Sequence, residues 1–348
     1  MIAFTITYLA IPIIVKAAVY KGLFAETNGR STHNTPTPVL GGVGVFAGFI
    51  LSTTVVAGAY FNFELSYLIT GLLLVFIVGV KDDLLGGTPH KKLIGQTLAI
   101  LIICILADIR ISTLHGFIGI AGIPYFWSII LTILVMLVII NGFNLIDGID
   151  GLASGIGILV SLILGCWFFI TGNIACTVMC AALIGGLISF FKYNVFSSTN
   201  KIFLGDTGSH IIGLVLGVLV VRFFQLEPYV KGIAEIDPVV AFSVSLFILP
   251  LFDTIRVFSL RIAQGKSPFK ADRQHIHHRM LELGLSHLQA TTILLSLNVA
   301  FIAICYLLQD LGNVILIGIQ FTVASILSYL LVMKVKTKKQ KNNSEKAQ

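Results

Sequence analysis

Charged side chains are scarce in this sequence. Only 11% of its 348 residues are Asp, Glu, Lys or Arg, whereas 56% are hydrophobic. Soluble domains carry roughly a quarter charged residues. The longest polar stretch, 260–286, is too short to form a domain of its own. The composition therefore excludes a large soluble enzyme.

Several further signatures are missing. The apolar runs do not alternate with a period of two residues, so we do not expect a β-barrel. The segment 2–20 lacks the basic start and small-residue cleavage site of a signal peptide, and we interpret it as a membrane helix. The five cysteines lie in apolar segments and form no metal-type pair, which is typical of small buried residues.

Long apolar runs are what the sequence has in abundance. They recur from end to end, and each is long enough to cross a bilayer as a helix. We predict an all-α polytopic membrane protein in which 1–333 form a single domain and 334–348 a basic, disordered tail. Eleven transmembrane helices are expected, near 2–20, 39–60, 65–80, 93–107, 124–141, 151–171, 174–191, 207–226, 238–258, 287–307 and 311–333.

The distribution of positive charge predicts the orientation. Most of the 23 Lys and Arg residues fall in alternate loops and in the tail. Positive loops mark the cytoplasmic face of a membrane. We therefore expect the N-terminus outside and the C-terminus in the cytoplasm. The net charge of +7 reflects this orientation, and we expect no nucleic-acid partner.

Every polar cluster with chemical potential falls on the predicted cytoplasmic side. The clusters are Lys81-Asp82-Asp83, 141–150, 203–209 and 272–278. Each taken alone has a simpler explanation, such as a helix cap or a basic loop lying on anionic lipid. Together they indicate one site at the cytoplasmic boundary of the membrane.

The residue types suit a phosphate-bearing nucleotide and a metal ion. Paired carboxylates such as Asp82 and Asp83 bind hard cations or accept protons. Asn141, Asn144, Asp147 and Asp150 recur at intervals of three, and their amides and carboxylates can contact a base, a sugar or a metal.

The third and fourth clusters point to a diphosphate. Asp206, at the start of a helix, would repel a phosphate bound there unless a metal bridged the two. The segment R-Q-H-I-H-H-R, 273–279, is dense in cationic and hydrogen-bonding groups. The spacing of its histidines fits a zinc site poorly, whereas the density of these groups suits a diphosphate.

These segments resemble a known family. D-D-L-L-G, N-G-F-N-L-I-D-G-I-D-G-L-A, F-L-G-D-T-G-S, P-L-F-D-T and S-P-F-K-A-D-R-Q-H-I-H-H-R occur in the order seen in the polyprenyl-phosphate N-acetylhexosamine-1-phosphate transferases, glycosyltransferase family 4. The H-I-H-H form resembles the branch that uses N-acetylglucosamine more than the branch that transfers phospho-muramoyl-pentapeptide.

The resemblance implies a reaction and a location. Undecaprenyl phosphate attacks the β-phosphorus of a UDP-N-acetylhexosamine, UMP leaves, and a lipid-diphosphate sugar for cell-envelope polysaccharide synthesis is formed. The cofactor is Mg²⁺ or Mn²⁺, and the enzyme works at the cytoplasmic face of the inner membrane as a homodimer. Direct attack needs fewer steps than a covalent aspartyl intermediate, although the sequence permits both.

The resemblance also implies roles for individual residues. The catalytic group is Asp82, Asp83, Asp147 and Asp206, of which Asp83, Asp147 and Asp206 bind the metal. Asp82 is the candidate base or orienting group for the lipid phosphate. The substrate-binding group is Asn144, Asp150, Phe203, Arg273, His275, His277 and His278. Asp150 would accept from the uracil N–H, and Phe203 would stack on the base.

Two other functions are compatible with parts of the pattern. The same chemistry could use another UDP-N-acetylhexosamine or a UDP-MurNAc-pentapeptide donor. Membrane acids also mark ion-coupled transporters, whose sites lie near the midplane between related halves. Here the acids cluster at one face and no internal repeat is visible, so a transporter is less favoured.

Overall fold

The computed structural model describes residues 1–24, 37–57, 64–120, 122–232, 235–265 and 275–346. The regular elements of these residues are helices. The longer ones are α1 (Ile2–Lys21), α2 (Gly41–Ala57), α3 (Glu64–Leu85), α4 (Pro89–Leu106), α5 (Tyr125–Ile146), α6 (Leu152–Ile170), α7 (Ile174–Phe191), α8 (Gly205–Leu226), α9 (Val239–Leu246), α10 (Ile248–Ala263), α11 (Ile276–Glu282), α12 (His287–Leu307) and α13 (Gly312–Lys346). Short turns are η1 (Phe117–Gly119), η2 (Lys192–Phe196), η3 (Glu227–Tyr229) and η4 (Gln309–Leu311).

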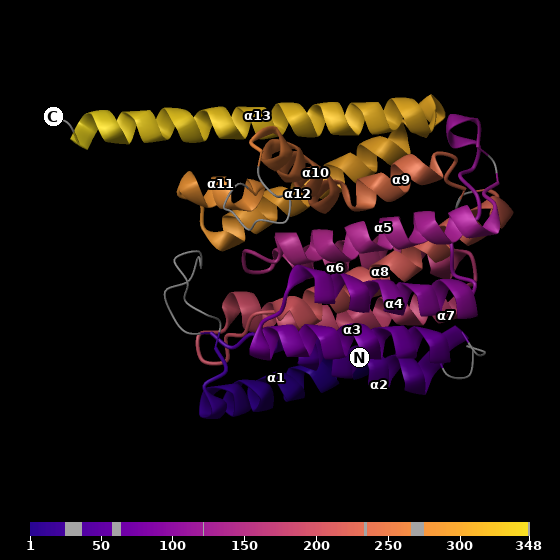
Figure 1. Cartoon of the computed structure of the whole chain (residues 1–348), viewed down its shortest axis with the longest axis horizontal. Helices are drawn as coiled ribbons and strands as arrows, with labels where there is room; N and C mark the ends of the chain where they lie inside the picture. The colour runs from indigo at the N-terminus through magenta and orange to yellow at the C-terminus, as the bar shows by residue number, and fades with distance from the viewer. Residues whose placement is uncertain (25–36, 58–63, 121, 233–234, 266–274, 347–348) are drawn as a thin grey trace.

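The helices lie side by side in one bundle, with α1 and α2 at one edge and α13 at the other (Figure 1). Helix α8 is the most deeply buried of them and packs against α5, α3, α2 and α6. It is apolar on all sides, as expected for a helix enclosed by other helices. Its first turn carries Asp206, so the packing of α8 fixes the position of the residue that bears this carboxylate.

The number of membrane crossings differs from the sequence prediction. In the described residues, eight helices are long and apolar enough to cross a membrane, or nine if α9 and α10 count as one broken span. The apolar helix 41–56 is shorter. The lengths and compositions of the described helices therefore support fewer crossings than the eleven predicted.

The predicted span 238–258 is broken at Phe247, where α9 and α10 meet at a bend of 80°. Pro250 lacks the N–H that would bond to the carbonyl of Leu246, which favours a break here. The amide of Asn298 donates to the carbonyls of Ser245 and Leu246, at 3.4 and 3.3 Å. Beyond the bend, α10 carries Asp253, which contacts His275 at the N-terminal end of α11.

Several helices extend beyond their predicted ends. Helix α3 continues to Leu85, α4 begins at Pro89, and α5 continues to Ile146. The polar residues Asp82, Asp83 and Asn144 therefore stand on helices and not in loops. Asp147 follows directly as the C-terminal cap of α5.

The C-terminal segment also differs from its predicted disorder. Helix α13 continues to Lys346 and projects past its neighbours at the same end of the bundle as α11 (Figure 1). No Gly or Pro follows Gly318, and Lys and Gln are good helix formers. Val335 is buried in this extension, so the segment packs against the rest of the chain.

Candidate active site

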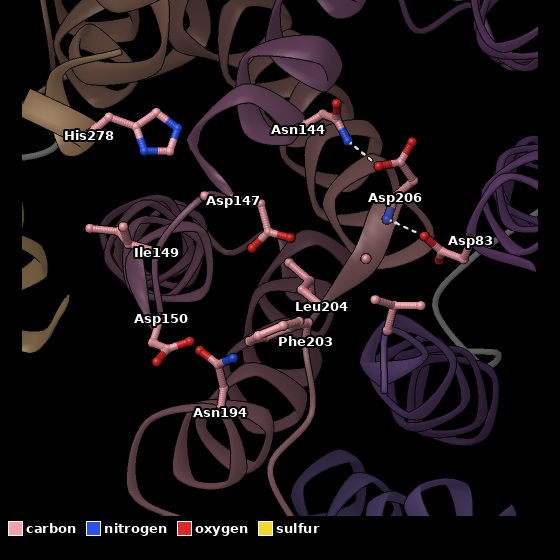
Figure 2. Close-up of a pocket in the computed structure, with 13 residues that line it drawn as sticks. Asp83, Asn144, Asp147, Ile149, Asp150, Asn194, Phe203, Leu204, Asp206 and His278 are labelled. Atoms are coloured by element: carbon pink, nitrogen blue, oxygen red, sulfur yellow. Dashed lines mark hydrogen bonds between the residues drawn. The ribbon is translucent and has the colours of Figure 1, made fainter. Parts of the chain in front are cut away.

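A cavity of about 380 Å³ lies at the C-terminal ends of α3 and α5 and the N-terminal ends of α8 and α11. It collects residues from all four polar clusters, and Figure 2 shows their side chains pointing into the same space. The lining residues are Val39, Asp83, Asn144, Asp147, Gly148, Ile149, Asp150, Asn194, Phe203, Leu204, Gly205, Asp206 and His278.

Asp83 caps the N-terminus of α8. Its Oδ1 accepts from the backbone N–H of Asp206 at 2.8 Å, and its Oδ2 accepts from the N–H and the hydroxyl of Thr207 at 3.0 and 2.5 Å. Gly205 has a φ of 74°, and a side chain there would collide with this carboxylate. Asp83 thus fixes the helix that carries Asp206, a role normally played by a residue of the same segment.

Asp206 is held from two sides. The amide of Asn144 donates to its Oδ1 at 2.8 Å (Figure 2). The ammonium of Lys92 contacts its Oδ2 and also lies 2.5 Å from Asp82. Lys92 was not singled out in the sequence, where it looks like one basic residue of a cytoplasmic loop. The early start of α4 turns it toward the carboxylates.

Asp147 has no hydrogen-bond partner among the described residues. Burial raises its pKa well above the usual value, and the negative charges of Asp206, Asp83 and Asp150 raise it further. The described residues contain no group of three or more His, Cys, Asp and Glu placed to hold a metal. The carboxylates of Asp147 and Asp206 nevertheless line one cavity, and a hard divalent cation fits this excess of negative charge.

Asp150 forms a second polar centre in the cavity. Its Oδ2 accepts from Lys201 at 2.7 Å, and His287 lies 3.6 Å away. Asn194 links the adjacent backbone segments, because it accepts from Gly151 N–H at 2.7 Å and donates to the carbonyl of Ile202 at 2.9 Å. Lys201, Asn194 and His287 were missed in the sequence, since none belongs to a recognisable motif.

Phe203 lines the same cavity, and its stacking on a base stays a prediction. Its backbone is tied to the segment before α2, because it donates to the carbonyl of Pro38 at 2.8 Å and accepts from Gly41 at 2.9 Å. The aromatic ring and the Asp150 carboxylate are thus brought together from segments far apart in the chain.

The three histidines belong to α11 and its N-terminal cap. His275 contacts Asp253 of α10 through Nδ1 at 2.9 Å, and Asp253 also pairs with Arg256 at 2.6 Å. His277 is buried, and its ring lies 4.3 Å from that of His278. Of these three histidines, which the sequence assigned to substrate binding, only His278 lines the cavity.

Asn141 does not line this cavity. Its amide donates to the buried Gln96 at 2.9 Å, one turn deeper in the bundle. Arg273 lies outside the described residues.

Asp82 lines a second cavity, of about 520 Å³, and does not line the first. Val78, Leu85, Lys91 and Lys92 are among its lining residues. Asp82 and Asp83 therefore line different cavities, and Lys92 with Asp206 connects them. The arrangement can bring two phosphate-bearing molecules together at one point.

Comparisons with known proteins identify the family. The sequence matches the profile of "Glycosyl transferase family 4" over residues 65–224. It is 30% identical over 308 residues to an undecaprenyl-phosphate alpha-N-acetylglucosaminyl 1-phosphate transferase of Salmonella typhi, covering 86% of this chain and 80% of the relative. The chain belongs to glycosyl transferase family 4.

Other relatives agree. The enzyme of the same name from Escherichia coli K12 is 30% identical over 83% of this chain and 77% of its own. A decaprenyl-phosphate N-acetylglucosaminephosphotransferase of Mycolicibacterium smegmatis is 27% identical over 94% of this chain and 86% of its own. The resemblance drawn from the motifs is confirmed. The range matched to family 4 runs from α3 to α8 and holds all four predicted catalytic carboxylates, whereas α11 lies beyond it.

Proposed function

We propose that this protein transfers N-acetylglucosamine-1-phosphate from UDP-N-acetylglucosamine to undecaprenyl phosphate and releases UMP. The observation that carries the proposal is the junction of two cavities at Asp206 and Lys92. Relatives that cover most of the chain are named for this transfer to polyprenyl phosphates. The same chemistry with another UDP-N-acetylhexosamine is the alternative.

The nucleotide sugar binds in the cavity that contains Asp147 and Phe203. Phe203 stacks on the uracil, and Asp150, held by Lys201, accepts from the uracil N–H. The diphosphate then lies toward Asp147 and Asp206, with His278 beside it. Neutral imidazole and amide groups can donate to phosphate oxygens without adding negative charge.

Asp147 and Asp206 are the residues that would hold Mg²⁺ or Mn²⁺. The cation supplies charge neutralisation for the diphosphate. Asp83 uses both of its oxygens on the first turn of α8, so its contribution is to fix Asp206. Asn144 orients the Asp206 carboxylate from the opposite side.

The lipid phosphate enters through the second cavity, which has apolar and basic walls. A phosphate group loses its second proton near pH 6, so a strong base is unnecessary. Lys92 attracts it, and Asp82 orients Lys92. A phosphate oxygen forms a bond to the β-phosphorus, the bond from that phosphorus to the bridging oxygen breaks, and UMP departs with the electron pair.

The membrane geometry follows from the substrates. UDP-sugars are soluble, whereas the acceptor is held in the bilayer, so the site belongs at the cytoplasmic boundary of the inner membrane. This orientation places the N-terminus of α1 outside and the end of α13 in the cytoplasm. The homodimer remains a prediction.

The test is a UMP-release assay on purified protein with undecaprenyl phosphate and Mg²⁺. The donors are UDP-N-acetylglucosamine, UDP-N-acetylgalactosamine and UDP-MurNAc-pentapeptide. We expect release that requires both lipid and cation, and that is fastest with the first donor. Asp206→Asn should abolish release, and Asp310→Asn, an exposed acid in η4, should not. Release from another donor alone would change the assigned sugar, and release from none would contradict the proposal.

A further inference from the structure

The short helix α11 is held at its two ends by different parts of the chain. At its N-terminal end, Asp253 of α10 contacts His275 at 2.9 Å and accepts from the N–H of Ile276 at 3.2 Å. At its C-terminal end, the contacts come from the charged extension of α13, residues 334–346. α11 carries the histidine that lines the catalytic cavity, so both ends matter for the site.

The C-terminal contacts are specific. Lys338 donates from Nζ to the carbonyl of Leu283 at 2.8 Å, which satisfies a backbone acceptor at the end of α11. Lys339 pairs with Glu282 at 3.0 Å, and Arg279 of α11 joins the same carboxylate at 3.1 Å. A cation at a helix C-terminus is also favoured by the helix dipole.

The apolar face of α11 is only partly packed, because Met280 is buried in the core but a cavity remains beside it. Ile276, Met280 and Leu283 line a cavity of about 340 Å³ that α10, α12 and α13 enclose on the other sides. Dispersion contacts are lost where a wall faces empty space, so core packing restrains α11 incompletely on this side. The polar contacts at the two ends add to this restraint.

The opposite face of α11 meets the catalytic loop. His277 is buried and lies directly against Gly148, the neighbour of Asp147. His278 lines the catalytic cavity beside it. A shift of α11 toward its empty side would withdraw both imidazoles from the loop that holds Asp147 and Asp150.

We propose that the charged extension of α13 is a positioning element of the active site, in which Lys338 and Lys339 hold α11 so that His277 and His278 stay against the catalytic loop. Lys338 and Lys339 contact Leu283 and Glu282, which are not predicted substrate groups. Its role in turnover rests on the proposed transferase function, whereas its effect on the position of α11 does not.

The experiment compares Lys338→Gln/Lys339→Gln with Lys338→Arg/Lys339→Arg in full-length protein reconstituted in nanodiscs. Lys336→Gln is the matched control, since Lys336 is exposed on the same helix and, within the part of the chain that the structure describes, forms no hydrogen bond or ion pair with α11. Amide hydrogen exchange of 276–283 is measured first, because it needs no catalysis. Kinetics with UDP-N-acetylglucosamine and undecaprenyl phosphate follow.

We expect the double Gln variant to exchange at least fivefold faster in α11 and to lose about fivefold in kcat/KM for the UDP-sugar, with the KM for the lipid unchanged. The Arg pair and Lys336→Gln should match the wild type in both. Unchanged exchange in the double Gln variant would overturn the proposal. Faster exchange with unchanged kinetics would also overturn it, because the contact would then be only structural. Wild-type protein without turnover would refute the transferase function while exchange still tests the contact.

Discussion

Gly148 lies directly against the imidazole of His277. A methyl group at Gly148 would come within 2.3 Å of Nε2 of His277. The two residues belong to separate polar clusters, one after α5 and one in α11, that are far apart in the sequence. Gly148 lines the catalytic cavity beside Asp147, and its contact with His277 leaves room for no larger residue.

Gly148→Ala should therefore push α11 away from the catalytic loop. We expect kcat/KM for the UDP-sugar to fall about 10- to 100-fold, since small displacements of positioning groups have effects of this size. Gly318→Ala is the control, because a methyl group there meets nothing within 4 Å. Steady-state kinetics and thermal unfolding are measured on both. Wild-type kinetics in Gly148→Ala would show that the contact has no role in catalysis.

Lys92 is the cation shared by Asp82 and Asp206. Lys92→Gln removes this charge and leaves the two carboxylates to repel each other and the incoming lipid phosphate. We expect kcat to fall about 100- to 1,000-fold, as when a group that stabilises a charged transition state is removed. Lys21→Gln, at an exposed lysine that ends α1 and lines neither cavity, should stay near wild type. Equal loss in both variants would point to a general effect of surface charge.

Lys201 orients Asp150 at the predicted base site. Lys201→Met should weaken the binding of UMP about tenfold, because hydrogen bonds to charged groups contribute roughly 1.5–3 kcal/mol. Lys201→Arg keeps the ion pair and should bind UMP nearly as well as the wild type. Calorimetric titration of each protein with UMP measures the difference. Equal affinity in the Met and Arg variants would remove Lys201 from the base site.

The pKa of His277 is lowered to about 3 by burial and then by the neighbouring charge of His278. In the unfolded chain a histidine titrates near 6.5. Folding therefore favours the neutral ring, and this stabilisation is complete above about pH 6.5 and is lost as the pH falls toward 3. The wild type should lose exchange protection of α11 in this window, and His277→Gln should lose less. His90→Gln, at an exposed site, should behave as the wild type does.

The sequence predicted the chemistry of the site better than its architecture. Asp147, Asp150, Phe203 and Asp206 could be identified because each sits in a short motif with a rare density of polar groups. Their convergence on one cavity followed from the expectation that polar loops of a membrane protein meet at one face. The resemblance to family 4 supplied roles that spacing alone left open.

Other features depend on tertiary contacts that no local pattern encodes. Asp83 was expected at the metal, but its oxygens bond to the first turn of α8, a partner more than a hundred residues away. Lys92 and Lys201 looked like ordinary basic loop residues until packing placed them beside carboxylates. The bend at Phe247 was missed because the apolar run continues through it, and Pro250 was its only local signal.

The most direct test of the account follows the β-phosphorus of the donor. UDP-N-acetylglucosamine labelled at that phosphorus is incubated with the protein, undecaprenyl phosphate and Mg²⁺, and the lipid fraction is separated and counted. The account predicts that the label enters the lipid in equal amount to the UMP released, and that Asp206→Asn abolishes both. UMP release without label in the lipid, or labelled lipid formed by Asp206→Asn at the wild-type rate, would contradict it.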